Sequence, residues 1–335
     1  MKRARERSVG RVGLSRFLQW RLNALLMRWL PRKIGSIYIR LLGKIYFFLN
    51  RDENDEIRRN LSAIITKLPY TDPVDLIIRR TFKGIFAHYH EKLLTAYFPY
   101  NKVCRFILKQ VNLEKQYLLD EALARGKGVI LVTAHFGAVE FLPTSLALNG
   151  YKVTMVVRFK TERLRRALSQ RAARLGITLL DAREREGVVF SACQALRSNQ
   201  ILITECDEFD AWRPHRNLQA TFLGCPAPLD RTIDLIQRRH DSSVIMGLVC
   251  RSRDNRYSLK LHSMNGIHEN LESASISKRA MEILQWYIYL APEQWYQWKH
   301  IRVLLGTGLF ESKGPLYETE TDQTPQFADS PLHAN

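Results

Sequence analysis

The chain has 335 residues, of which 46% are hydrophobic and 25% are charged. This composition is ordinary for a folded globular protein, so it excludes a largely disordered chain, and the length suits one large α/β domain. With 51 Lys and Arg against 33 Asp and Glu, the net charge is +18. Phosphates, anionic lipid head groups, acidic proteins or nucleic acid are therefore the expected partners. None of the five cysteines lies in a Cys-x-x-Cys pair, which argues against a zinc ribbon or a disulfide framework.

Residues 1–50 are predicted to form a basic, amphipathic helical region that associates with a membrane surface. Large apolar residues recur at steps of three and four and fall on one helical face: Leu14, Leu18, Leu22, Leu25 and Trp29. A membrane-spanning helix is harder to place, because the best apolar stretch, residues 34–49, contains two basic residues. It is also shorter than the roughly 20 residues that a bilayer core requires. The alternative is that the apolar face packs on the protein's own core.

Residues 51–310 are predicted to form one α/β domain, with a helical entry over 51–125 and a sheet region over 126–310. Short apolar runs typical of buried strands occupy 129–132, 152–157, 201–204 and 244–249, with a further strand at 257–262. Helical stretches lie at 162–175, 187–198, 231–239 and 274–290. This alternation predicts a mostly parallel central sheet flanked by helices. Residues 311–335 are polar and are predicted to be a disordered tail.

His135 is the first candidate catalytic residue, because it follows the predicted strand 129–132. In open parallel sheets, ligands bind beyond the carboxyl ends of the strands. Glu140 is the expected partner of His135, although five residues on a straight helix would separate their side chains by about 140°. We therefore expect a bend at Gly137 to bring them together. A carboxylate on one imidazole nitrogen would leave the other nitrogen as a general base. The alternative is a structural histidine.

No Gly-x-Ser-x-Gly motif or other obvious nucleophile is present, so the base is expected to activate a hydroxyl or amine of the substrate itself. His88 and His90 lie two residues apart on a predicted helix and face different directions. They are predicted to be wall or surface residues rather than metal ligands.

Several motifs together resemble the bacterial lipid A biosynthesis acyltransferases, the late Kdo-lipid A family within the lysophospholipid and glycerol-phosphate acyltransferase superfamily. They are His135-Phe136-Gly137-x-x-Glu140, Val157-Arg158, Asp207, Phe222-Leu223-Gly224-x-Pro226-Ala227 and the block from Pro292 to His300. The last block is the most specific of them. In this block Trp295 and Trp298 are expected to pack in the core.

The resemblance implies a glycerol-phosphate acyltransferase-like fold, with His135 as general base and Glu140 as its partner. It also implies that Arg158 binds an oxyanion or a substrate phosphate, and that Asp207 is an acidic residue on the floor of the same site. The alternatives are a solvated charge for Arg158 and a helix cap for Asp207. Family members commonly have Asn and Trp where this chain has Ala138 and Val139, and they commonly carry a clear amino-terminal anchor. Both departures concern the acceptor rather than the reaction class.

The sequence thus predicts an acyltransferase at the cytoplasmic face of a bacterial inner membrane. The expected donor is acyl carrier protein or acyl-CoA, and the expected acceptor is a hydroxyl or amine of a lipid A-like, phospholipid-like or other glycolipid. No cofactor, metal or nucleic acid is expected. The alternatives are a catalytically silent membrane-associated scaffold and a basic nucleic-acid-binding protein.

Overall fold

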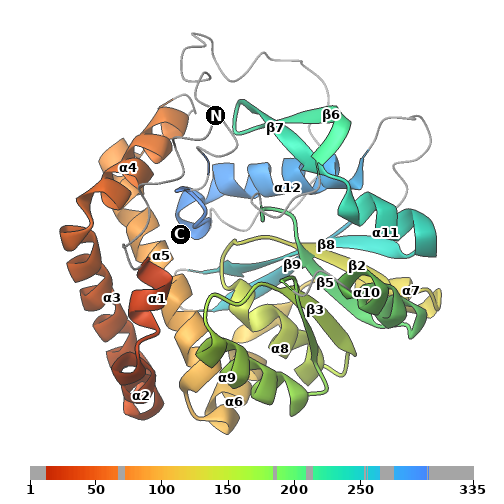
Figure 1. Cartoon of the computed structure of the whole chain (residues 1–335), viewed down its shortest axis with the longest axis horizontal. Coiled ribbons are helices and arrows are strands. Elements are labelled where there is room, and N and C mark those ends of the chain that lie inside the picture. Colours follow the sequence, from red (N-terminus) through yellow and green to blue (C-terminus); the bar gives the residue numbers. More distant parts are fainter. Residues whose placement is uncertain are drawn as a thin grey trace.

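The computed structural model describes residues 13–66, 72–183, 187–208, 214–252, 254, 256–264, 275–299 and 301. The predicted polar tail, 311–335, lies outside these residues, as do the first residues of the predicted amino-terminal region. Within the described residues the fold is α/β, with a central sheet and helices on both of its faces (Figure 1).

The central sheet has seven strands in the order β1-β9-β8-β2-β5-β3-β4. Their bounds are β1 Val111–Leu113, β2 Val129–Thr133, β3 Val153–Val157, β4 Thr178–Asp181, β5 Ile201–Glu205, β8 Ser243–Arg251 and β9 Tyr257–Ser263. All neighbouring pairs are parallel except β8 and β9. The predicted mostly parallel sheet is therefore confirmed. Strands β1 and β4 were not predicted, because their short apolar runs are interrupted by polar residues.

The two faces of β2 bury alternate residues, as the strand periodicity requires. Val129 and Leu131 belong to a core formed with the helices α6 Tyr100–Gln110, α7 Tyr117–Ala124, α8 Leu142–Leu148 and α9 Glu162–Ala173. Ile130 and Val132 belong to a second core, formed with α10 Val188–Arg197, α11 Thr232–His240 and α12 Ile276–Leu290. Because all five residues of β2 are buried, the strand reads as a continuous apolar run in the sequence.

A hairpin of β6 Pro214–Phe222 and β7 Cys225–Asp230 lies apart from the main sheet, next to α12 (Figure 1). Its turn residues Leu223 and Gly224 both have positive φ angles, of 51° and 78°. Two consecutive positive φ angles are typical of the tight turn that fits the twist of a two-stranded ribbon. The Phe-Leu-Gly motif of the sequence is therefore a hairpin turn.

Among the described residues, α6 and five earlier helices precede the sheet: α1 Leu14–Leu18, α2 Arg21–Trp29, α3 Arg32–Leu49, α4 Arg51–Ile65 and α5 Val74–Tyr97. The predicted apolar stripe is split, because the helix is interrupted at Gln19 and Trp20. Leu14 and Leu18 are buried in the protein's own core, whereas the three later residues are exposed: Leu22, Leu25 and Trp29. The helical part of the amino-terminal prediction is confirmed for the described residues from Leu14 to Leu49, and its association with a membrane stays a prediction. Among the described helices, none is long and apolar enough to cross a bilayer.

Helix α3 presents a row of exposed apolar side chains along one face. The row recurs at steps of three and four and consists of Ile34, Ile37, Leu41, Ile45 and Phe48. The opposite face of α3 packs through Ile39 and Phe47 into the protein core. The helix is therefore apolar on both sides, and the core accounts for only one of them.

Helix α5 packs closely against the short helix η4 Pro292–Gln294, with no room for a side chain at Gly84. A Cβ atom at this position would lie 1.8 Å from the main-chain oxygen of Glu293. We expect Gly84→Ala to lower the free energy of unfolding by on the order of 3 kcal/mol, because the main chain must move to accept it. Gly35→Ala is the matched control. Its Cβ would lie 3.3 Å from the flexible end of Met27 and 3.5 Å from the His90 Nε2 atom, which is ordinary contact. Chemical denaturation of both variants measures the difference, and equal stabilities would contradict this packing.

Candidate active site

His135 lies in a loop that begins at the carboxyl end of β2 and is held by main-chain hydrogen bonds. The Gly137 N–H donates to the Gln294 oxygen at 2.8 Å, and the Ala138 N–H donates to the Val249 oxygen at 2.8 Å. Gly137 has a φ of +58°, and a Cβ there would lie 1.9 Å from the Val249 oxygen. The glycine of the motif is thus required both by its conformation and by the close approach of β8.

Asp207 is the carboxylate that holds His135. The residue has no exposed surface, and its Oδ1 lies 3.0 Å from the imidazole Nδ1. The main-chain N–H of His135 donates to both carboxylate oxygens at 3.0 Å. The indole N–H of Trp295 donates to Oδ2 at 2.8 Å. Asp207 therefore fixes both the position and the orientation of the imidazole, and its predicted placement in the same site as His135 is observed.

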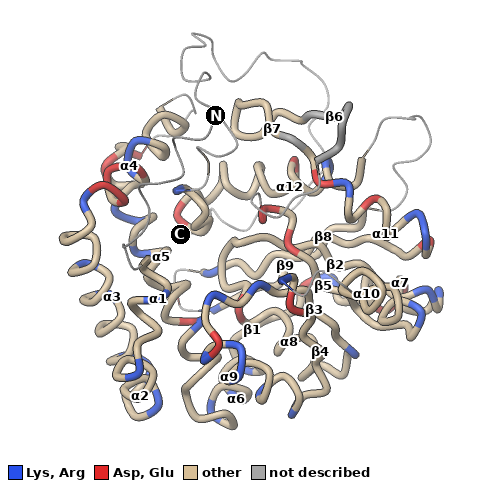
Figure 2. Tube along the Cα trace, viewed as in Figure 1, with Lys and Arg blue, Asp and Glu red and all other residues tan. Residues whose placement is uncertain are grey.

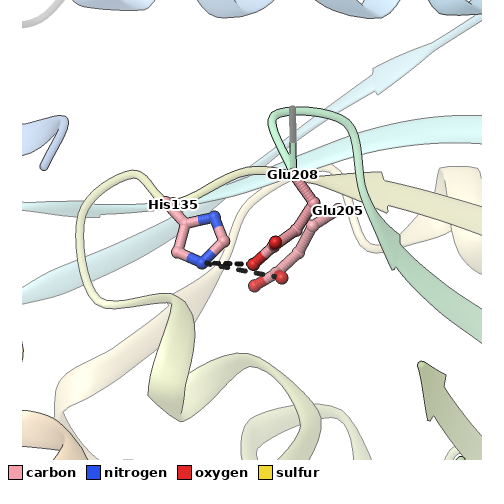
Figure 3. A group of neighbouring side chains, drawn as sticks. All are labelled: His135, Glu205 and Glu208. Carbon is pink, nitrogen blue, oxygen red and sulfur yellow. Dashed lines mark ion pairs between the residues drawn. The ribbon is translucent and has the colours of Figure 1, made fainter. Parts of the chain in front are cut away.

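The other imidazole nitrogen, Nε2, faces two further carboxylates (Figure 3). It lies 3.3 Å from Glu208 and 3.7 Å from Glu205. Burial alone would lower the pKa of His135, but the charges of Glu205, Asp207 and Glu208 outweigh burial and raise the pKa to about 10. Burial raises the pKa of Glu205 to about 7, against the opposing effect of His135. His135 is therefore a strong base whose protonated form is stabilised from both sides of the ring.

The predicted contact between His135 and Glu140 is not formed. Glu140 lies in the short helix η1 Val139–Phe141, and its Oε1 forms an ion pair with Lys92 of α5 at 2.9 Å. The same oxygen lies 3.9 Å from His88. The turn at Gly137 directs Glu140 toward α5, while His135 meets the end of β5. The bend predicted at Gly137 is present, but it separates the two side chains instead of joining them.

A cavity of about 260 Å³ contains His135, Glu140, Arg158 and Asp207 in its wall. Arg158 follows the last residue of β3 and is exposed. The structure therefore brings all four predicted residues to one cavity, although the pairing of His135 differs from the prediction. Another part of the cavity wall is apolar and comes from β3, α9, β4 and the adjoining turns. It includes Met155, Leu168, Leu175, Ile177 and Leu179.

Tyr296 and His88 complete the surroundings of the base. The Tyr296 ring meets His135 edge-on at 5.3 Å and stacks on the His88 ring at 3.6 Å between centroids. The Tyr296 hydroxyl and the His88 Nδ1 are buried and have no hydrogen-bond partner within the described part of the chain. Both residues line the cavity, so the prediction of His88 as a wall residue is confirmed.

Residues 292–299 of the late sequence block support the loop of His135. The side chain of Gln294 bonds to both main-chain groups of Arg251, at 2.7 and 3.1 Å. Arg251 forms a buried ion pair with Glu91 and also donates to the Gly137 oxygen. Trp295 and Trp298 have no exposed surface, and Trp298 donates to the Pro292 oxygen at 3.1 Å. Both tryptophans pack in the core as predicted, and Trp295 also bonds directly to Asp207.

Sequence reasoning missed Glu205, Glu208, Lys92 and Tyr296. The signal for the first two was visible, because the acidic run 205–208 directly follows a predicted buried strand. The two residues that depart from the family pattern differ in position: Val139 lines the cavity, whereas Ala138 is buried in the core.

His135, Glu205 and Glu208 could together hold a cation, because their ligand atoms all lie within 4.8 Å of one another. A histidine whose other nitrogen bonds a carboxylate is a common metal ligand. The same geometry also suits a protonated imidazole among carboxylates, which needs no metal. We therefore derive no chemical step through an ion at this position.

The family model described as bacterial lipid A biosynthesis acyltransferase matches residues 6–303. No curated protein matches the chain.

The electrostatics of the site predict an unusual titration of His135. We expect its imidazole pKa, measured by NMR, to lie well above 6.5, its ordinary value. Glu208→Gln should lower this pKa, because one of the three charges that stabilise the imidazolium is removed. Glu282→Gln, an exposed position outside the cavity, should leave it unchanged. A pKa that is the same in wild type and Glu208→Gln would show that Glu208 does not act on the ring.

Proposed function

Because the chain belongs to the bacterial lipid A biosynthesis acyltransferase family, we propose that it transfers a fatty acyl chain from a thioester directly to a lipid acceptor. The donor is acyl carrier protein or acyl-CoA. The acceptor supplies a hydroxyl or amine and is a lipid A-like, phospholipid-like or other glycolipid. We further propose that the reaction occurs at the cytoplasmic face of the inner membrane.

One observation carries this proposal: a single cavity joins a directed histidine to an apolar wall. The wall formed by β3, α9 and β4 offers a fatty acyl chain a surface that excludes water. The polar part of the same cavity offers His135 with one nitrogen fixed by Asp207. A thioester whose chain lies on this wall would have its carbonyl near the base.

In the proposed mechanism, His135 first releases its proton, and Nε2 of the neutral ring then removes the proton from the acceptor hydroxyl or amine as that group attacks the thioester carbonyl. The resulting imidazolium is stabilised by Asp207 and by the carboxylates on the other side of the ring. When the tetrahedral intermediate collapses, the carbon–sulfur bond breaks and the leaving sulfur takes the proton from His135. Arg158, at the cavity wall, is the proposed binder of the oxyanion or of a substrate phosphate. Asp207 acts as the group that orients the base.

The exposed apolar row of α3 supports the proposed membrane location. Together with Leu22, Leu25 and Trp29 of α2, it forms an apolar surface outside the protein core. A surface of this kind, with basic residues at its edge, suits the boundary between head groups and acyl chains. The acceptor lipid would then reach the cavity without leaving the bilayer.

The role of His135 is tested by incubating wild type and His135→Ala with a lipid extract and either acyl-acyl carrier protein or acyl-CoA. Mass spectrometry of the lipids should show an acylated product with wild type and a rate lower by roughly 10²–10⁴-fold with His135→Ala. His240→Ala, at the end of α11 and away from the cavity, is the matched control and should retain the wild-type rate. Equal rates in His135→Ala and wild type would rule out this mechanism. Absence of product with wild type and with both variants would favour a catalytically silent scaffold instead.

A further inference from the structure

A second hollow lies beside the catalytic cavity and differs from it in charge. This groove has a volume of about 1090 Å³ and is bounded by α2, the end of α5, α6 and α9. Seven cations line it: Arg21, Arg28 and Arg32 from the amino-terminal helices, Lys102 from α6, and Arg163, Arg171 and Arg174 from α9 and its end. No carboxylate belongs to its wall among the described residues. Figure 2 shows basic positions on α2, α6 and α9 at the same end of the molecule.

The cations of the groove are not paired with carboxylates of the described residues. None of the seven forms an ion pair with a carboxylate in the part of the chain that the structure describes. Several are held by uncharged groups instead. Arg171 donates to the Thr95 oxygen at 3.0 Å and also to the Phe98 oxygen, and Arg163 donates to the Gln19 oxygen at 3.3 Å. These contacts fix the guanidinium groups while leaving their positive charge available to a ligand.

Two further features of the groove favour an anionic ligand that accepts hydrogen bonds. The Tyr97 hydroxyl, in the groove wall, is buried without a partner among the described residues. Burial lowers the pKa of Arg171, and the positive charges of Arg174 and Arg28 lower it further. An anion with several oxygen atoms would both accept from the hydroxyl and relieve the repulsion among the arginines.

The surroundings of the groove indicate where such an anion comes from. Leu25 and Trp29 line the groove and are 54% and 76% exposed. Helix α3, which carries the exposed apolar row, follows α2 directly in the chain, and the groove cations share its wall with these exposed apolar side chains. Phosphates beside hydrocarbon are the chemistry of a lipid bilayer. Tyr100 and Arg171 line both the groove and the catalytic cavity, which makes the two hollows neighbours.

We infer that this groove binds the phosphate groups of a membrane lipid and presents that lipid to the catalytic cavity. The identification of the bound lipid as the acceptor rests on the proposed function. Binding of the phosphate itself does not, because the groove contains none of the residues assigned to the chemistry. A phosphate in the groove and a hydroxyl or amine in the cavity would belong to one molecule, with the acyl chains of the lipid along α2 and α3.

The inference is tested by binding the full chain to phosphatidylcholine vesicles with and without phosphatidic acid, in the absence of a donor. The groove variant is the combination of Arg21→Gln, Arg28→Gln and Lys102→Gln, all exposed positions. It should lose at least about tenfold in affinity for the anionic vesicles, because cations near a membrane surface act strongly only within a Debye length. The matched control removes the same charge from another surface through Arg197→Gln, Arg238→Gln and Arg239→Gln on α10 and α11. It should bind almost as wild type does.

Further arms of the same experiment distinguish lipid phosphate from free phosphate. They also distinguish failure of this inference from failure of the proposed function. Trp29→Ser should also weaken binding to the anionic vesicles, and inorganic phosphate should fail to displace the wild-type chain from them. Equal affinities in the groove and control variants would overturn the inference. Full displacement of the wild-type chain by inorganic phosphate would also overturn it. So would a groove variant that binds the anionic vesicles as wild type does but no longer binds acyl carrier protein. Vesicle binding that depends on the groove in a chain without transfer activity would refute the proposed function alone.

Discussion

The candidate site depends on one buried carboxylate. Asp207 accepts hydrogen bonds from the main chain and the imidazole of His135 and from the indole of Trp295. These groups come from the end of β2, the end of β5 and the segment after α12, which are far apart in the sequence. A buried carboxylate is costly unless its oxygens are bonded, so each of these contacts is needed for the others to form. Asp207 thereby joins the loop of the base to the late tryptophan block, which the main-chain hydrogen bond from Gly137 to Gln294 also connects.

The arrangement has a clear electrostatic consequence. Three carboxylates surround one imidazole, and their charges overcome the effect of burial on its pKa. Such a ring accepts a proton strongly, and the imidazolium that forms is already stabilised. Lys92 and Glu140 form a separate pair in the wall of the same cavity. The wall of the neighbouring groove carries arginines of α2, and exposed apolar residues of the same helix lie in that wall. His135 and the apolar wall share one cavity, and the basic groove is its neighbour.

Much of the fold could be predicted from sequence, because buried parallel strands are continuous apolar runs bounded by turn residues. The run 129–132 after two glycines was sufficient to locate β2 and hence His135. The partner of His135 could not be predicted in this way. Asp207 is 72 residues away, and the contact depends on β5 being the neighbour of β2, with Thr133 opposite Glu205. Strand order is a property of the packed sheet, so spacing along the chain favoured Glu140. The interruption between α1 and α2 at Gln19 and Trp20 was also not predicted, because the apolar residues keep their helical spacing across it.

The central claim is that Asp207, and not Glu140, orients the catalytic base. It is tested most directly by comparing the acyl-transfer rates of Asp207→Asn and Glu140→Gln, with circular dichroism to show that both variants are folded. Replacing the buried carboxylate should cost on the order of 10³–10⁴-fold in kcat, because the imidazole loses its fixed tautomer and the charge that stabilises the imidazolium. Glu140→Gln should retain most of the rate, since Glu140 contacts Lys92 and not the base. A rate lost in Glu140→Gln and kept in Asp207→Asn would contradict the account.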